Sequence, residues 1–199
     1  AMVDRSSVAD RVIILADRGY ESYNNLAHIE RKGWKYLIRI KDISGNGILS
    51  GLDLPSSPAW DLDIHRILTR KQTNVVKQNP TLYRFLPTNS TFDFLDINEA
   101  PYYPINFRIV RFQLTDNTYE TVITNLDRDV FPPEKLKQLY NLRWGIETAF
   151  RSLKYSVGLL AFHSKKAAFI TQEIFAALIM YNLCQMIASS AIIAKKGTR

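Results

Sequence analysis

The chain has 199 residues, of which 46% are hydrophobic and 23% are charged, and these proportions exclude an intrinsically disordered chain. Its one cysteine, Cys184, excludes a disulfide framework within the chain, and we interpret it as a small buried residue of a helix in a cytosolic protein. Lysine and arginine number 26 against 19 for aspartate and glutamate, and the net charge of +7 favours an anionic partner such as nucleic acid.

The first segment, residues 8–42, has the pattern of a strand, a helix and a second strand. Residues 12–16 form a continuous apolar run, which predicts a strand covered on both faces. Residues 35–40 predict the next strand. Because the connection between them is compact, we expect the two strands to be parallel and joined by a right-handed crossover.

The connection begins at Asp17, where the sequence Asp17-Arg18-Gly19-Tyr20 breaks the first strand. Ser22 belongs to the residue types that cap helix N-termini, so we expect a helix over residues 22–31. Gly33 then provides a signal for the C-terminal end of that helix.

Residues 43–125 differ in character from the segment before them. They contain most of the prolines, together with short stretches of alternating apolar and polar residues. Asp116 and Asn117 can turn a hairpin between residues 107–114 and residues 119–124. We interpret the whole segment as a β-rich insertion.

Residues 126–199 are predicted to be helical. Two adjacent prolines, Pro132 and Pro133, fit the first turn of a helix, which we expect to run to about Tyr155. Gly158 follows and breaks the pattern.

A second helix is predicted over about residues 167–188. The apolar run continues to residue 194 and is long enough to cross a membrane. It contains polar side chains such as Glu173, which are costly within a bilayer, so we favour a buried or interface helix.

A row of polar side chains marks residues 140–154. At about 100° per residue along one continuous helix, four side chains fall within an arc of roughly 60°: Tyr140, Arg143, Glu147 and Lys154. A different side of that helix is expected to face the core: Leu139, Leu142, Ile146, Ala149, Phe150 and Leu153. The row fits an ordinary solvated face in which Arg143 pairs with Glu147. The poor helix former Gly145 and the aromatic ring of Trp144 favour instead a surface that binds a partner.

The spacing of these four polar residues, Tyr-x2-Arg-x3-Glu-x6-Lys, resembles the signature of a family of bacterial insertion-sequence DDE transposases, the insertion-sequence-four type. The segment Ala16-Asp17-Arg18-Gly19-Tyr20 resembles the surroundings of that family's second catalytic aspartate. The resemblance covers essentially the whole chain. It implies an α/β fold with an RNase H-like core in residues 1–42 and 126–199, interrupted by the β-rich insertion of residues 43–125 and ending in C-terminal helices.

The resemblance also implies a chemistry. In that family three carboxylates bind two Mg²⁺ ions, with Mn²⁺ as a substitute, for DNA strand cleavage and transfer at transposon ends. Asp17 and Glu147 would be catalytic and metal-binding here. Only 16 residues precede Asp17, so we expect an N-terminally truncated core without the first aspartate, reduced metal occupancy, and little or no activity of the chain alone. The alternative role for Asp17 is that of a turn or helix-capping residue.

By the same resemblance, Tyr140, Arg143 and Lys154 would contact phosphates of transposon-end DNA, with Trp144 and Arg151 beside them. The expected location is the bacterial cytoplasm, at the nucleoid. Two other functions fit the sequence. One is a non-catalytic DNA-binding or dimerisation module derived from a transposase, and the other is an unrelated RNase H-like nuclease.

The expected truncation would have a structural consequence at residues 12–16. That strand would lack its covering neighbour, so we expect a homodimer or another device that covers the exposed edge. His28, His65 and His163 do not show metal-ligand spacing, and we interpret them as structural.

Overall fold

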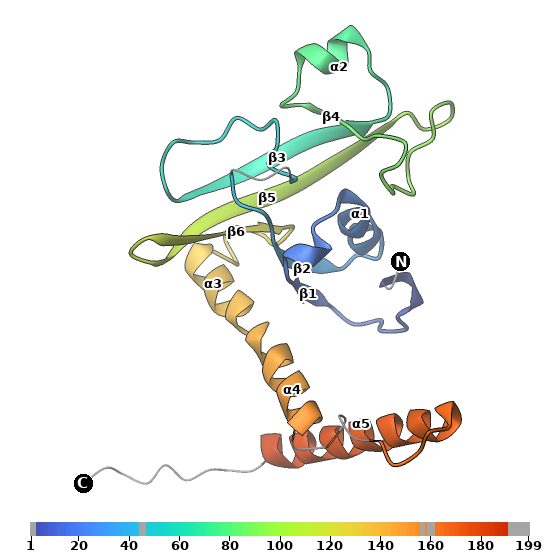
Figure 1. Ribbon diagram of the computed structural model, residues 1–199. Coiled ribbons are helices and arrows are strands. Elements are labelled where there is room, and N and C mark those ends of the chain that lie inside the picture. Colours follow the sequence, from blue (N-terminus) through green and yellow to red (C-terminus); the bar gives the residue numbers. More distant parts are fainter. Residues whose placement is uncertain (1–2, 44–46, 156–157, 159–161, 191–199) are drawn as a thin grey trace, which may run out of the picture. The chain divides into compact units, whose positions relative to one another are not determined.

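The computed structural model describes residues 3–43, 47–155, 158 and 162–190 of the chain. These residues belong to two compact units, Ala1–Arg143 and Trp144–Arg199. Among the described residues, the strands lie in the first unit and two helices lie in the second, and Figure 1 shows these elements along the chain.

The first unit contains a six-stranded sheet with the strand order β1-β2-β6-β5-β3-β4. β1 pairs with β2 and β3 pairs with β4 in parallel, whereas the other neighbours are antiparallel, so the sheet is mixed and β1 lies at one edge. The strands are β1 Ile13–Ala16, β2 Lys35–Arg39, β3 Trp60–Thr69, β4 Tyr83–Phe85, β5 Tyr102–Thr115 and β6 Thr118–Thr124. Three short helices accompany them: η1 Val3–Arg5, η2 Arg18–Tyr20 and α2 Asn74–Gln78.

The segment from β1 to β2 confirms the predicted strand, helix and parallel strand. α1, Tyr23–Arg31, begins after Ser22, whose hydroxyl accepts a hydrogen bond from the N–H of Asn25 at 3.2 Å. Gly33 follows the helix with φ at 72°, a left-handed conformation that glycine adopts without strain.

The burial of β1 differs from the prediction that both of its faces are covered. Ile13 is 37% exposed, and Ala16 alone of its four residues is buried. Among the described strands β1 has a paired neighbour on one side only, and an edge strand is reached by fewer covering side chains than a central strand.

β5 and β6 form the predicted hairpin across Asp116 and Asn117. β5 also pairs with β3, and β6 pairs with β2. The strands of residues 43–125 therefore continue the sheet that β1 and β2 begin. The division of the chain into domains at residues 42 and 125 stays a prediction.

Alternation along the strands gives the sheet two apolar faces. On one face, α1 packs over a cluster that includes Ile38, which is 1% exposed. On the other face, Leu136 and Tyr140 pack with Leu37, and these two residues come from α3, Pro133–Asn141. α3 therefore covers the face of the sheet that α1 leaves open.

An ion pair fixes the loop before α3 to the sheet. Arg108 on β5 is 3% exposed and donates to both carboxylate oxygens of Asp61 on β3, at 2.7 and 2.6 Å. The same guanidinium donates to the carbonyl oxygen of Phe131 at 2.7 Å. From the solvent side, Arg128 contacts Asp61 at 3.1 Å and Asp63 at 2.8 Å.

A second buried arginine, Arg66 on β3, joins two loops to the sheet. Its side chain is 0% exposed. Its guanidinium donates to five oxygens at 2.9 to 3.4 Å, namely the hydroxyl of Tyr23 and the carbonyls of Ile48, Ser50, Pro80 and Thr81. Hydrogen bonding in several directions satisfies a group that is otherwise costly to bury.

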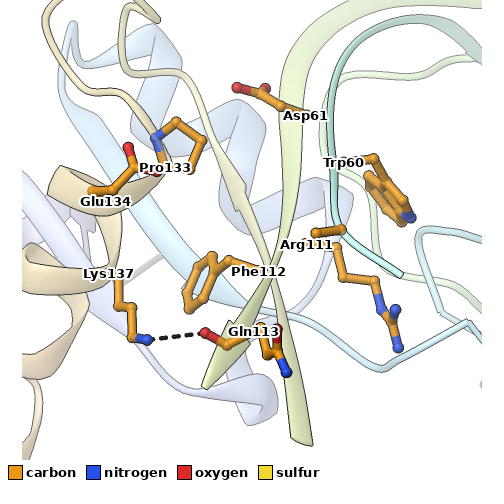
Figure 2. A pocket seen from close by; sticks show the side chains of 9 residues that line it. Trp60, Asp61, Arg111, Phe112, Gln113, Pro133, Glu134 and Lys137 are labelled. Atoms are coloured by element: carbon orange, nitrogen blue, oxygen red, sulfur yellow. Dashed lines mark hydrogen bonds between the residues drawn. The ribbon is translucent and has the colours of Figure 1, made fainter. Parts of the chain in front are cut away.

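A groove lies between the start of α3 and the strands β3 and β5 (Figure 2). Its lining includes Asp61 of the ion pair, Phe112 and Pro133. At one side Lys137 donates to the carbonyl oxygen of Gln113 at 2.9 Å, which ties α3 to β5. The residues that line this groove include none of the site residues predicted from the sequence.

The prediction of one continuous helix to about Tyr155 was wrong. α3 ends at Asn141, and α4, Trp144–Tyr155, begins after a turn at Leu142 and Arg143. The N–H groups of Leu142 and Arg143 bond to carbonyls three residues earlier rather than four, so the backbone leaves the α-helical path.

Because of this break, residues 140–154 do not lie on one continuous helix. The prediction that Tyr140, Arg143, Glu147 and Lys154 fall within one arc depended on such a helix. Leu142, Ile146 and Phe150, which were expected to face the core, are 66%, 50% and 58% exposed. Leu153, by contrast, is buried as expected. Gly145 lies directly after the break, where its low helix propensity favours an interruption.

α5, Ala167–Ser190, is the second helix of the second unit. By length and composition it could cross a membrane, with a mean hydropathy of 1.4 over Ala167–Ala188 and no buried share in that stretch. A single helix of this kind is weak evidence for a membrane span. Cys184 is exposed on α5, which corrects the prediction of a buried cysteine, because α5 is apolar on all sides and its residues are not packed inside the structure.

Candidate functional site

Asp17 follows β1 directly, at the carboxyl end of the strand. Its side chain is 51% exposed. Oδ1 accepts the N–H of Arg18 at 2.8 Å, and the Asp17 carbonyl accepts the N–H of Tyr20 at 2.9 Å, which closes the turn η2. Asp17 therefore has the capping role that the sequence offered as an alternative. A capping carboxylate keeps lone pairs for a further ligand, so this role does not compete with a catalytic one.

Arg39, the last residue of β2, lies beside Asp17. The parallel register places Ala16 opposite Ile38, so the next residues along the two strands, Asp17 and Arg39, fall on one face. Nη1 of Arg39 is 4.0 Å from Oδ1 of Asp17. Nε of Arg39 is 3.1 Å from Oε1 of Glu120 on β6, whose side chain is 11% exposed.

Sequence reasoning did not find Arg39 or Glu120. Arg39 had a signal, because a charged residue at the end of the strand parallel to β1 must lie near Asp17. Glu120 had none, because its position depends on the pairing of β2 with β6.

Tyr140 of α3 joins the same cluster. Its side chain is 2% exposed, and within the described part of the chain its hydroxyl has no hydrogen-bond partner. Burial raises the pKa of Tyr140 to about 12, with smaller effects from nearby charges, of which Arg143 and Arg39 lower it and Asp17 and Glu120 raise it. The guanidinium of Arg143 lies 5.5 Å from the centre of the Tyr140 ring. Of the predicted site residues, the first unit therefore places Arg143 against Tyr140, and Tyr140 within the electrostatic influence of Asp17.

The other predicted site residues lie on α4, in the second unit. Glu147 is in its first turn and Lys154 in its last turn, and both are exposed. Trp144 is 56% exposed, and Arg151 is exposed one turn beyond Glu147. Seven residues are close to two full turns, so Glu147 and Lys154 share a face of α4. Asp17 and Glu147 belong to separate units, and the pairing of these two residues stays a prediction.

A divalent metal is implied by the predicted chemistry, and the donor types fit it. Asp17 and Glu147 supply carboxylate oxygens, the hard ligands that Mg²⁺ and Mn²⁺ prefer. Within the described ranges no three His, Cys, Asp or Glu side chains gather into a metal-binding group.

The three histidines make contacts with neighbouring side chains. Both ring nitrogens of His28 face carboxylates, Nδ1 at 3.1 Å from Oδ1 of Asp4 and Nε2 at 2.7 Å from Oδ2 of Asp93. His65 pairs with Asn106 across β3 and β5, and Nδ1 of His163 lies 3.4 Å from Glu173. His28 thus connects the N-terminal segment, α1 and the loop around residue 93.

Comparison with known proteins identifies the family. A family model described as "Transposase DDE domain" matches residues 2–183, which is most of the chain. The chain therefore belongs to the transposase DDE domain family, and the resemblance to a DDE transposase is confirmed at that level. The mixed α/β architecture agrees with such a domain. A search of the curated proteins found no match.

Proposed function

We propose that this member of the transposase DDE domain family forms part of a metal-dependent active site that cleaves and joins DNA strands at transposon ends. One observation carries the proposal. Asp17 stands half exposed at the carboxyl end of β1 with Arg39 beside it, and the charge of Asp17 reaches Tyr140, whose ring lies against Arg143. Ligand sites of α/β sheets gather at the carboxyl ends of strands, and arginine beside such a carboxylate suits a phosphodiester substrate.

In this proposal Asp17 and Glu147 hold Mg²⁺ or Mn²⁺. Bound divalent ions activate the attacking oxygen and stabilise the leaving oxygen in phosphodiester displacement. Arg143 and Lys154 bind DNA phosphates, the first as a planar fork and the second as a point charge. Tyr140 orients Arg143 by packing its ring against the guanidinium.

The finer assignment is to the insertion-sequence-four group. Its support is the Tyr-x2-Arg-x3-Glu-x6-Lys spacing, which does not depend on a continuous helix. Trp144 and Arg151 flank that row on α4 and would add contacts to the same DNA. The proposed place of action is the cytoplasm, at the nucleoid.

We expect the chain by itself to cleave DNA weakly or not at all, because Asp17 and Glu147 are two carboxylates and the family's chemistry uses three. The test is nicking of supercoiled DNA in the presence of Mn²⁺ or Mg²⁺, with wild type, Asp17→Asn and Glu147→Gln. The control is Glu134→Gln, which makes the same isosteric change at an exposed glutamate in the first turn of α3. Robust metal-dependent cleavage that Glu147→Gln abolishes and Glu134→Gln does not would refute the expected inactivity.

A non-catalytic DNA-binding or dimerising role is the second candidate, favoured by the exposed edge strand β1 and the positive charge. It predicts salt-dependent binding of duplex DNA that survives Asp17→Asn and falls about three- to tenfold with Arg143→Ala or Lys154→Ala. Lys77→Ala on α2 is the control, since it removes one exposed positive charge from outside the row. Absence of binding at low salt would contradict both candidates.

A further inference from the structure

Arg39 lies between two carboxylates that it contacts unequally. Nε is 3.1 Å from Oε1 of Glu120, whereas Nη1 is 4.0 Å from Oδ1 of Asp17. The side chain of Glu120 is 11% exposed, and that of Asp17 is 51% exposed. An ion pair gains more from a short contact away from water, so Glu120 is the stronger partner of Arg39.

The strand register explains why Glu120 is held in this place. Arg39 lies opposite Val122, and Glu120 is two residues further along β6, on the same face of the sheet. Phe112, which is 7% exposed, lies opposite Glu120 on β5. A carboxylate with an apolar neighbour and little exposure needs a cationic partner, so Glu120 keeps Arg39 close.

The position of Arg39 matters for Asp17. A guanidinium in full contact with a carboxylate covers its oxygens and compensates its charge, and both effects oppose the binding of another cation. At 4.0 Å from Asp17, Arg39 makes only a loose contact.

From this geometry we propose that Glu120 is a positioning residue, which holds Arg39 back from Asp17 and so keeps the Asp17 carboxylate open to a divalent cation. The inference rests on the proposed metal-binding role of Asp17. It assigns to Glu120 no contact with the cation itself.

Two substitutions separate positioning from a plain effect of charge. Glu120→Gln keeps the reach of the side chain and removes the charge, whereas Glu120→Asp keeps the charge and shortens the reach. If Glu120 acts through Arg39, both variants release Arg39 toward Asp17, and the affinity for Mn²⁺ falls about two- to fivefold in each, the scale of one partly exposed ion pair. If Glu120 acts only through the electrostatic effect of its negative charge, Glu120→Asp leaves the affinity for Mn²⁺ unchanged, and this result would overturn the inference.

A metal-free measurement tests the position of Arg39 directly. In wild type we expect Asp17→Asn to leave the Arg39 Nε–H resonance in the ¹H–¹⁵N NMR spectrum almost unmoved, because Glu120 holds that group. In the Glu120→Gln background the same Asp17→Asn change should shift the resonance clearly, because Arg39 has turned to Asp17. Equal shifts in the two backgrounds would overturn the inference, whatever the metal affinities are.

The Mn²⁺ titration, followed by the electron paramagnetic resonance signal of free Mn²⁺, also tests the proposed function. Arg39→Gln should raise the affinity, and Asp17→Asn should abolish binding at the first unit. Binding that Asp17→Asn leaves intact would refute the metal role of Asp17. If Mn²⁺ binding depends on Asp17 but its affinity is unchanged in both Glu120 variants, the positioning role alone is refuted.

Discussion

Replacing Asp61 with asparagine should destabilise the first unit more than is usual for a partly exposed residue of a sheet. Asp61 accepts two short hydrogen bonds from Arg108, which is 3% exposed. Asparagine has nearly the same shape but carries no charge and turns an amide toward the guanidinium. Arg108 would then remain buried with neutral acceptors alone, the amide oxygen of the new asparagine and the carbonyl of Phe131.

The magnitude follows from the burial of the two partners. Removing one member of a fully buried ion pair costs about 3–5 kcal/mol, because the other charge stays in the interior. The side chain of Asp61 is 21% exposed, so water compensates part of this cost, and we expect a loss of about 2–4 kcal/mol. With an m-value of about 2 kcal/mol/M, the urea midpoint falls by about 1–2 M.

The assay is urea unfolding followed by tryptophan fluorescence in a Trp144→Phe background. The remaining tryptophans, Trp34 and Trp60, are each 8% exposed and both belong to the first unit. The control is Asp63→Asn, which removes a carboxylate that is 71% exposed and contacts Arg128. A midpoint for Asp61→Asn within about 0.2 M of the control would refute the reasoning, because an exposed pair of this kind is worth less than about 1 kcal/mol.

Three further predictions rest on single side chains. Arg66→Met should cost about 3–5 kcal/mol in urea unfolding, since it removes a donor from five oxygens, of which the carbonyls of Ile48 and Ser50 keep another donor, and Arg66→Lys should recover part of the loss. Burial alone would raise the pKa of Asp61, but hydrogen bonds and charge from Arg108 and Arg128 hold the pKa below its usual 3.8. The ionised Asp61 carboxylate therefore stabilises the folded state fully above pH 3.8. This contribution is lost as the pH falls through the lower pKa that Asp61 has in the folded protein. Unfolding free energies measured between about pH 5 and pH 2 should therefore fall less steeply in Asp61→Asn than in wild type. Tyr140→Phe should leave stability unchanged or raise it by up to about 1 kcal/mol, and a larger loss would show that the buried hydroxyl has a partner.

The local features of the fold could be predicted because their causes lie within a few residues. Ser22 caps α1 through the N–H three residues later, and Gly33 adopts the left-handed conformation that ends the helical segment. Asp116 and Asn117 turn the hairpin that their flanking strands require. In each case the residue determines the backbone conformation within a few positions of itself, so the cause lies in a short stretch of sequence.

The break between α3 and α4 was missed for a different reason. The apolar spacing favoured one helix, and Gly145 favoured an interruption, so two local signals disagreed. Packing of Leu136 and Tyr140 against the sheet, rather than propensity, determines where α3 lies. That packing depends on strands more than ten residues away in the sequence, which a helical pattern does not describe.

Glu120 and Arg39 show the limit for the candidate site. They are 81 positions apart in the sequence, and their contact depends on which strand lies next to β2. A β-rich insertion with several strands offers several possible neighbours, each of which would place a different side chain beside Arg39. The position of Asp17 at a strand end was thus predictable and Arg39 beside it had a sequence signal, whereas Glu120 could not be predicted.

The break also changes what the four-residue spacing means. On one continuous helix, Tyr140, Arg143, Glu147 and Lys154 would act together because they share a face. In the structure, Tyr140 and Arg143 belong to the unit of Asp17, whereas Glu147 and Lys154 belong to α4. The proposed DNA-binding residues Arg143 and Lys154 therefore belong to separate units, which follow one another in sequence directly after the turn at residues 142–143. This predicts that inserting one alanine after Leu142 weakens DNA binding about as much as Lys154→Ala, whereas inserting one after Tyr155 does not.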